Sequence, residues 1–228
     1  MEITFTNTLS IPLDGFEPKP AKNVFPGWLK ELPTYANSEK KPTGEGRTAQ
    51  TIKKCMPVFD AISAGYIIFS YCDVYVSIKD DAHWFEWPQG KPLEFHPEWQ
   101  APTYPDTDGS MIPKWINPWG IQTPKGYSCL FIPPVHRESV FSILEGLVDT
   151  DTYNANVNFP FLMKNKNFEG MIPAGTPIAQ VIPFKRDDWE IKFGTQEDDL
   201  KAKNQVYAMR NNFFDGYKKL FRQNKEYK

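Results

Sequence analysis

Short apolar runs separated by glycine- and proline-rich turns recur along most of the chain. They lie at residues 3–11, 66–78, 120–123, 127–133, 141–148, 154–163 and 178–184. Pro124-Lys125-Gly126 and Pro173-Ala174-Gly175 have the composition of turns. Short strands at regular spacing are typical of sandwiches and barrels, so the sequence predicts a mainly β fold, an antiparallel β-sandwich or jelly roll.

The C-terminal pattern is helical. Thr195 and Asp198 have the spacing of a capping box. Beyond them, apolar residues recur at steps of three and four: Val206, Met209, Phe213, Tyr217 and Leu220. We therefore expect a sandwich domain over residues 1–194 and an amphipathic C-terminal α-helix over 195–228 that packs on the sandwich through this stripe.

Residues 80–118 combine tryptophan and proline in a way that predicts an irregular excursion with short strands. Its tryptophans are candidates for surface aromatics: Trp84, Trp87, Trp99 and Trp115. Exposed indole faces could stack on sugar rings or bases, or anchor a protein partner. The alternative is a buried cluster of tryptophan and proline that fixes the long loop.

Composition narrows the functional classes. A formal net charge of -2 provides no overall field to recruit nucleic acid or an anionic membrane. No apolar run of about 18 residues exists, so no membrane span is predicted. Three cysteines without paired spacing indicate free thiols in a reducing compartment, and residues 1–5 lack the features of a signal peptide. We expect a cytoplasmic protein of a host cell or of an infecting virus.

No metal or cofactor is predicted. The three histidines, His83, His96 and His136, do not have the spacing of a metal site, and no Cys pairs exist. Asp149 and Asp151 would point to one face of a strand, where they could bind a cation or a sugar hydroxyl. The alternative, which we favour, is a turn in which the Asp-Thr-Asp-Thr side chains bind nearby backbone.

Four segments, in chain order, resemble motifs of the β-clip family of deoxyuridine triphosphatases (dUTPases) and dCTP deaminases. They are Ala64-Gly65-Tyr66-Ile67-Ile68, Pro133 to Ser139 around Arg137, Gly146-Leu147-Val148-Asp149 with Tyr153 beyond, and Pro177-Ile178-Ala179-Gln180. The resemblance implies a dUTPase-like sandwich. It also implies a nucleotide site near Arg137, Ser139, Asp149 and Tyr153.

The catalytic positions of that family are altered. Ile67 stands where the first motif has the Asp that positions or activates water. Glu138 is an extra residue between Arg137 and Ser139, and one residue too many separates Asp149 from Tyr153. A lysine-rich C-terminal segment replaces the family's glycine-rich arm. These departures favour a non-enzymatic protein, because a fold does not carry its chemistry with it.

The whole chain also resembles a family encoded by tailed phages of marine bacteria, of the cyanophage type. The segments that carry this resemblance are residues 52–57, 123–131 and 148–153. It implies a phage origin and a location in the host cytoplasm or in the virion. It implies no activity.

Three hypotheses follow. The first is a phage-encoded binding, assembly or accessory protein without enzymatic activity, which self-associates or binds a phage or host protein. The second is a nucleotide-binding or nucleotide-hydrolysing protein that uses Arg137, Ser139, Asp149 and Tyr153. The third is a carbohydrate-binding module that uses the tryptophan-rich segment.

Overall fold

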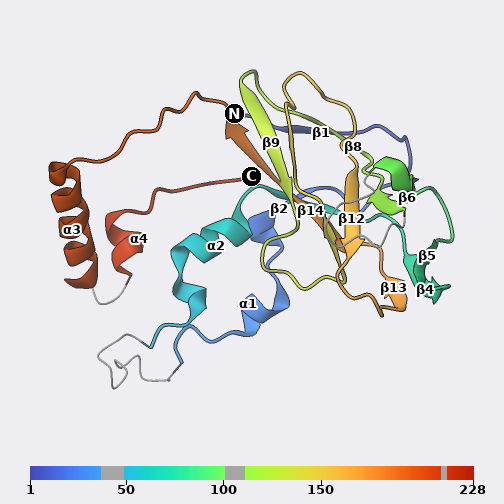
Figure 1. Ribbon diagram of the computed structural model, residues 1–228, viewed down its shortest axis with the longest axis horizontal. Helices are drawn as coiled ribbons and strands as arrows, with labels where there is room; N and C mark the ends of the chain where they lie inside the picture. The colour runs from blue at the N-terminus through green and yellow to red at the C-terminus, as the bar shows by residue number, and fades with distance from the viewer. Residues whose placement is uncertain (37–48, 101–110, 212–214) are drawn as a thin grey trace. The chain divides into compact units, whose positions relative to one another are not determined.

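The computed structural model describes residues 1–36, 49–100, 111–211 and 215–228 (Figure 1). The chain divides into two compact units, one of Met1–Val24 with Gly65–Arg186 and the other of Phe25–Ala64 with Asp187–Lys228. Residues 39–48 are charged and glycine-rich, which predicts an exposed loop, and they lie outside the described residues. The predicted boundary at residue 194, and the packing of residues 195–228 on the sandwich, stay predictions.

The first unit holds four antiparallel sheets among the described residues. The largest has the strand order β11-β9-β14-β3-β2. Its strands are β2 (Lys19–Pro20), β3 (Tyr66–Phe69), β9 (Tyr127–Ile132), β11 (Gly146–Val148) and β14 (Pro177–Lys185). β14 pairs with β3 along its first half and with β9 along its second half, so it lies at the centre of the sheet.

Three smaller sheets complete the unit. One has the order β10-β12-β7-β6, with β6 (Leu93–His96), β7 (Ile112–Trp115), β10 (Phe141–Ile143) and β12 (Phe159–Met163). A second consists of β13 (Gly170–Ile172), β4 (Val74–Lys79) and β5 (Ala82–Glu86), and the third of β1 (Thr4–Asn7) and β8 (Trp119–Gln122). The predicted class, mainly antiparallel β with helix toward the C-terminus, is confirmed.

Aromatic side chains fill the core of the first unit. Trp115 stacks on Phe161, with ring centroids 5.2 Å apart and an interplanar angle of 22°. Phe141 lies within 5.3 Å of both rings. Trp115 is only 1% exposed, so the prediction that it is a surface aromatic is wrong. β7 lies between β6 and β12, and an inward-pointing residue of such an inner strand is buried whatever proline surrounds it.

One predicted strand is two. Residues 141–148 form β10 and β11, which belong to different sheets. The chain changes sheet at Leu144, whose backbone N–H donates to Pro160 O at 2.7 Å. A short segment that is apolar at most of its positions cannot distinguish this crossing from a single strand, because both bury apolar residues along the same stretch.

Short helices make up most of the regular structure in the second unit. Its elements are α1 (Gly27–Glu31), the 3-10 turn η2 (Ile52–Lys54), α2 (Met56–Ser63), α3 (Gln196–Asn211) and α4 (Gly216–Leu220). Two further 3-10 turns, η1 (Ala21–Asn23) and η3 (Glu98–Gln100), lie in the first unit. None of the helices in the described residues is long and apolar enough to cross a membrane.

The capping box at the start of α3 is confirmed. Thr195 N donates to Asp198 Oδ2 at 2.8 Å, and Asp198 N donates to Thr195 Oγ1 at 3.4 Å. The prediction of one continuous helix is wrong, because α4 begins after Asp215, whose φ of 62° is left-handed. The Asp215 carboxylate pairs with Lys54 at 2.8 Å. Phe213, a residue of the predicted stripe, lies outside the described residues.

A second ion pair holds the C-terminal residues against α2. Arg222 Nη2 lies 2.7 Å from Asp60 Oδ1, and Arg222 Nε donates to both carboxylate oxygens at 3.1 Å. Lys225 Nζ adds a contact of 3.1 Å to Asp60. The hydrogen bonds from Arg222 lower the pKa of Asp60 from its ordinary value. Arg222 and Lys225 are therefore held in place by their contacts with Asp60.

Gly65 is required where β3 enters the central sheet. Its φ is +65°, and a Cβ there would lie 1.9 Å from Val181 O of β14. We predict that Gly65→Ala lowers the free energy of unfolding by about 3 kcal/mol or more, because both the left-handed backbone and the neighbouring strand oppose a side chain. Urea denaturation measures this loss.

Gly126→Ala is the matched control. Gly126 is also left-handed, with φ +86°, but nothing lies within 4 Å of its Cβ position. Its loss should be about 1 kcal/mol, the cost of the backbone conformation alone. Equal losses for the two variants would mean that the close approach of β3 to β14 is not a constraint.

Candidate functional site

Three neighbouring strands bring a set of polar side chains to one edge of the five-stranded sheet. β9 begins at Tyr127, β11 ends at Val148, and β14 ends at Lys185. The register pairs Val148 with Cys129 and Lys185 with Tyr127. The residues just outside β11 and β14 are consequently neighbours, although 37 positions separate Asp149 from Arg186.

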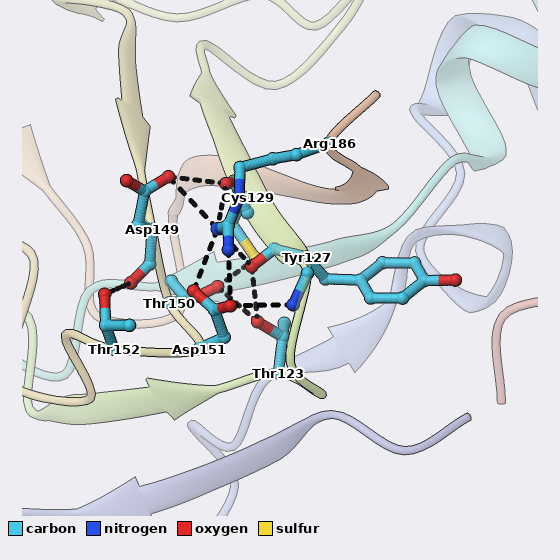
Figure 2. A network of polar contacts seen from close by, with 10 residues as sticks. Thr123, Tyr127, Cys129, Asp149, Thr150, Asp151, Thr152 and Arg186 are labelled. Carbon is cyan, nitrogen blue, oxygen red and sulfur yellow. Dashed lines mark hydrogen bonds and ion pairs between the residues drawn. The ribbon is translucent and has the colours of Figure 1, made fainter. Parts of the chain in front are cut away.

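Arg186 lies at the centre of this group (Figure 2). Its Nη1 donates to Asp151 Oδ1 at 2.8 Å, to Ser128 Oγ at 2.9 Å and to Asp149 Oδ1 at 3.2 Å. Its Nη2 donates to Asp151 Oδ2, which completes a bidentate pair. We call Arg186, Asp149, Asp151 and Ser128 the Arg186 cluster. Planar, two-point pairing of this kind is stronger and more directional than a single contact.

Asp151 is the more deeply enclosed carboxylate. Its side chain is 3% exposed, and Gly126 N donates to Oδ2 at 2.7 Å. The Arg186 hydrogen bonds, followed by that of Gly126, lower the pKa of Asp151 from 3.8 to about 2. Asp151 therefore remains ionised at any physiological pH and is a poor proton acceptor.

Asp149 is more open and lies in a turn. Its side chain is 66% exposed and accepts a hydrogen bond from Ser128 Oγ at 2.6 Å. Its backbone carbonyl accepts from the N–H groups of Thr152 at 3.0 Å and Tyr153 at 2.8 Å. The predicted turn is therefore present, and Thr152 Oγ1 donates to Asp149 O at 3.1 Å as expected. The aspartate side chains differ from the prediction, because the hydrogen bonds that hold them come from groups of other segments. The two carboxylates do face a common cation, but that cation is Arg186.

Small buried polar residues lie next to the Arg186 cluster and bind one another. Thr123 Oγ1 and Thr150 Oγ1 lie 2.8 Å apart and share a hydrogen bond, and Thr150 Oγ1 lies 3.3 Å from Cys129 Sγ. Burial raises the pKa of Cys129, so its thiol is not a reactive nucleophile. The cluster has no activated nucleophile in this position.

Arg137 follows β9 and has a different environment. Gln180 Oε1 accepts from Val135 N at 2.9 Å and fixes the chain just before it. Arg137 Nη2 donates to Val24 O. Its Nε is buried and has no hydrogen-bond partner among the described residues, and burial lowers the pKa of the guanidinium. A buried guanidinium nitrogen without an acceptor is uncommon.

The four predicted ligand residues fall into two separate pairs. Asp149 and Tyr153 share the turn through their backbone hydrogen bond, and Tyr153 Oη donates to Asn156 O at 3.5 Å. Arg137 and Ser139 share the segment after β9, where Ser139 Oγ accepts from Phe141 N at 3.3 Å. In the described part of the chain, these hydrogen bonds stay within each pair and do not join one pair to the other. Their convergence on a ligand stays a prediction.

Two of the predicted surface tryptophans are open to solvent. Trp99 is 75% exposed and Trp84 is 51% exposed. Lys79 Nζ lies 5.0 Å from the ring centroid of Trp84, so a cation already covers one face of that ring. Trp87 is half-buried and donates from Nε1 to Gly90 O at 3.0 Å. Stacking of a sugar on Trp84 or Trp99 stays a prediction.

Within the described residues, no group of three histidine, cysteine or carboxylate side chains is arranged to hold a metal ion. Sequence reasoning missed Arg186 and Ser128 as partners of Asp149. The available signal was the position of Arg186 directly after the apolar segment that forms β14. A charged residue at the end of a central strand lies close to the ends of the neighbouring strands, where a carboxylate can pair with it.

Comparison of the structure with solved structures finds phage dUTPases. The dUTPase of phage phi11 of S. aureus aligns with a TM-score of 0.32 and 17% sequence identity, over 58% of this chain and 84% of that chain. The dUTPase of Staphylococcus bacteriophage 80alpha aligns with a TM-score of 0.31 and 16% identity, over 58% of this chain and 76% of that chain. No protein-family model and no curated protein matches the chain. At TM-scores this low, residue roles rest on the contacts of this chain alone.

The Arg186 cluster predicts a specific dependence of stability on pH. Because the folded-state pKa of Asp151 is depressed to about 2, its stabilisation is present above pH 4 or so and is lost as pH falls through about 2. We expect Asp151→Asn to lower the melting temperature at neutral pH. The difference from the unsubstituted protein should shrink steeply as pH falls toward 2, because Asp151 then takes up a proton and loses its charge.

Asp149→Asn provides the comparison. Its carboxylate is mostly exposed and has one contact to Arg186, so its substitution should lower the melting temperature less. Thermal melts followed by circular dichroism between pH 2 and pH 7 measure both. A deficit of Asp151→Asn that stays constant across this range would contradict the assigned ion pair.

Proposed function

We propose that this chain is a non-enzymatic, phage-encoded binding or assembly protein built on a dUTPase-like sandwich. One observation carries the proposal. Ile67, at the position where the dUTPase motif has its water-activating Asp, is 0% exposed on β3 and pairs with Gln180 of β14. An aliphatic side chain sealed in the central sheet cannot accept a proton or hold a water for attack.

The remaining polar groups support the same proposal. Asp151 is enclosed by Arg186 and Gly126, and Asp149 shares that guanidinium. A general base needs an accessible lone pair and a pKa near the working pH, and Asp151 meets neither condition. In this proposal, the polar side chains of the Arg186 cluster stabilise the fold by binding one another and do not bind a nucleotide. The partner we propose is a second copy of the chain, or a phage or host protein, in the host cytoplasm or in a virion.

A nucleotide-binding protein is the second candidate, and Arg137 favours it. Its buried Nε has no hydrogen-bond acceptor, and an anionic group such as a phosphate would supply one. In that case the ligand would contact Arg137 and Ser139, which follow the end of β9. It would also have to reach Asp149 and Tyr153 near the start of β9, where Asp149 contacts Ser128. Such a protein would bind or sequester a nucleotide without hydrolysing it.

Two assays separate the candidates. With dUTP or dCTP and Mg²⁺, we expect no release of pyrophosphate or ammonia above the protein-free rate. In a thermal-shift screen over nucleotides we expect no stabilisation, whereas a ligand at 100 times its dissociation constant would add about 2.7 kcal/mol. Either assay uses the full chain.

Matched variants decide a positive result. Stabilisation by a nucleotide that disappears in Arg137→Gln and persists in Lys166→Gln would establish the second candidate, since Lys166 is an exposed lysine elsewhere on the first unit. Turnover that disappears in Asp149→Asn would contradict the non-enzymatic proposal outright.

A further inference from the structure

The segment after β14 exposes large apolar side chains to an unusual degree. Trp189 is 90% exposed, Ile191 is 88% exposed and Phe193 is 94% exposed. Residues 187–194, which we call the apolar arm, belong to no helix and to none of the described sheets. In an extended chain alternate residues point to one side, so an extended arm would present these three side chains on a single apolar face.

This exposure is not that of a loose chain end. Arg186, directly before the apolar arm, is held by the Arg186 cluster. On the far side, Asp215 pairs with Lys54 and Arg222 pairs with Asp60. Between these fastenings, every residue from 187 to 211 is exposed. The chain is tied at both ends and still leaves its apolar residues uncovered.

The uncovered surface is large for a monomer. Two aromatic side chains and an isoleucine at this exposure present on the order of 500 Å². Soluble monomers rarely expose a contiguous apolar patch above a few hundred Å², and patches of this size usually mark an interaction surface. The apolar arm therefore has the exposure expected of an interaction surface.

The sequence of the arm identifies a partner, because it is complementary to itself. If two arms pair antiparallel about Ile191, Trp189 of each copy lies opposite Phe193 of the other. On the other face, Glu190 lies opposite Lys192 in both directions. Asp188 falls opposite Gly194, so no like charges are opposed. Aromatic pairs and opposite charges are the cross-strand pairs that stabilise sheets.

We propose that the apolar arm pairs with the same segment of a second copy of this chain, forming a twofold two-stranded ribbon. A twofold interface must be self-complementary, and Trp-Glu-Ile-Lys-Phe meets this condition at each position. Glu190 and Lys192 lie symmetrically about Ile191, an arrangement that a twofold pairing requires and that binding to an unrelated protein does not. The arm pairing assigns a specific surface to the proposed assembly role. Its biological purpose rests on that proposed function, whereas the pairing itself does not.

Helix α3 can cover the apolar face of the ribbon. A two-stranded ribbon alone is marginal in water, so its face must pack against something. α3 follows the arm directly and exposes Leu200 at 59% and Tyr207 at 69%, seven residues apart on one side of the helix. Two arms contribute about 1,000 Å², and two helices bring the total toward the roughly 1,200–2,000 Å² of stable interfaces.

Charge reversal tests the pairing in the full chain. Glu190→Lys alone opposes lysines at both charge pairs, and Lys192→Glu alone opposes glutamates. By sedimentation velocity we expect a dimer for the unsubstituted chain and a dissociation constant at least about tenfold weaker for each single variant. An equimolar mixture of the two variants should dimerise again, as should the chain that carries both substitutions, because opposite charges then face each other.

Two further variants complete the test. Trp189→Ala should weaken the dimer by about a hundredfold or more, since it removes both aromatic pairs. Lys166→Glu, an exposed charge reversal outside the arm, should leave association unchanged. Circular dichroism melts establish that each variant is folded. A monomeric unsubstituted chain, or single reversals that are not rescued on mixing, would overturn the arm pairing, and neither result would bear on the absence of nucleotide hydrolysis.

Discussion

The burial of β14 between β9 and β3 is the constraint on which the first unit depends. Residues 178–181 are all buried, so this strand contributes to the interior on both faces rather than on one. Its backbone approaches Gly65 too closely for any side chain there, and its buried Gln180 holds the segment after β9. The strand ends at Lys185, which delivers Arg186 to the neighbouring carboxylates.

This constraint explains why Asp149, one of the four predicted ligand residues, contacts Arg186, just after β14, and Ser128 of β9. The end of the central strand places one guanidinium beside two carboxylates, and three charges that satisfy each other have little capacity left for a ligand. Function is then expected at the surface. Among the described residues, three highly exposed apolar side chains, Trp189, Ile191 and Phe193, lie on the segment that continues from β14.

The sequence predicted the strand-rich fold and the turn at Asp149, because alternation, glycine and short polar residues act locally. It failed where the outcome depends on distant neighbours. The prolines around Trp115 predicted an irregular segment, whereas Trp115 lies on an inner strand and is buried. Arg186, the partner of Asp149, lies 37 positions away in the sequence. The break before α4 depends on one left-handed residue, Asp215, whose carboxylate is held by Lys54.

Amide hydrogen exchange tests the central role of β14 most directly. If the strand is buried between two partners, its amides open only when the whole unit unfolds. Residues 178–182 should then exchange slowest in the chain, with the free energy of global unfolding measured by denaturant, while the edge strand β11 exchanges through smaller local openings. Exchange of residues 178–182 as fast as that of Gly146–Val148 would contradict the account.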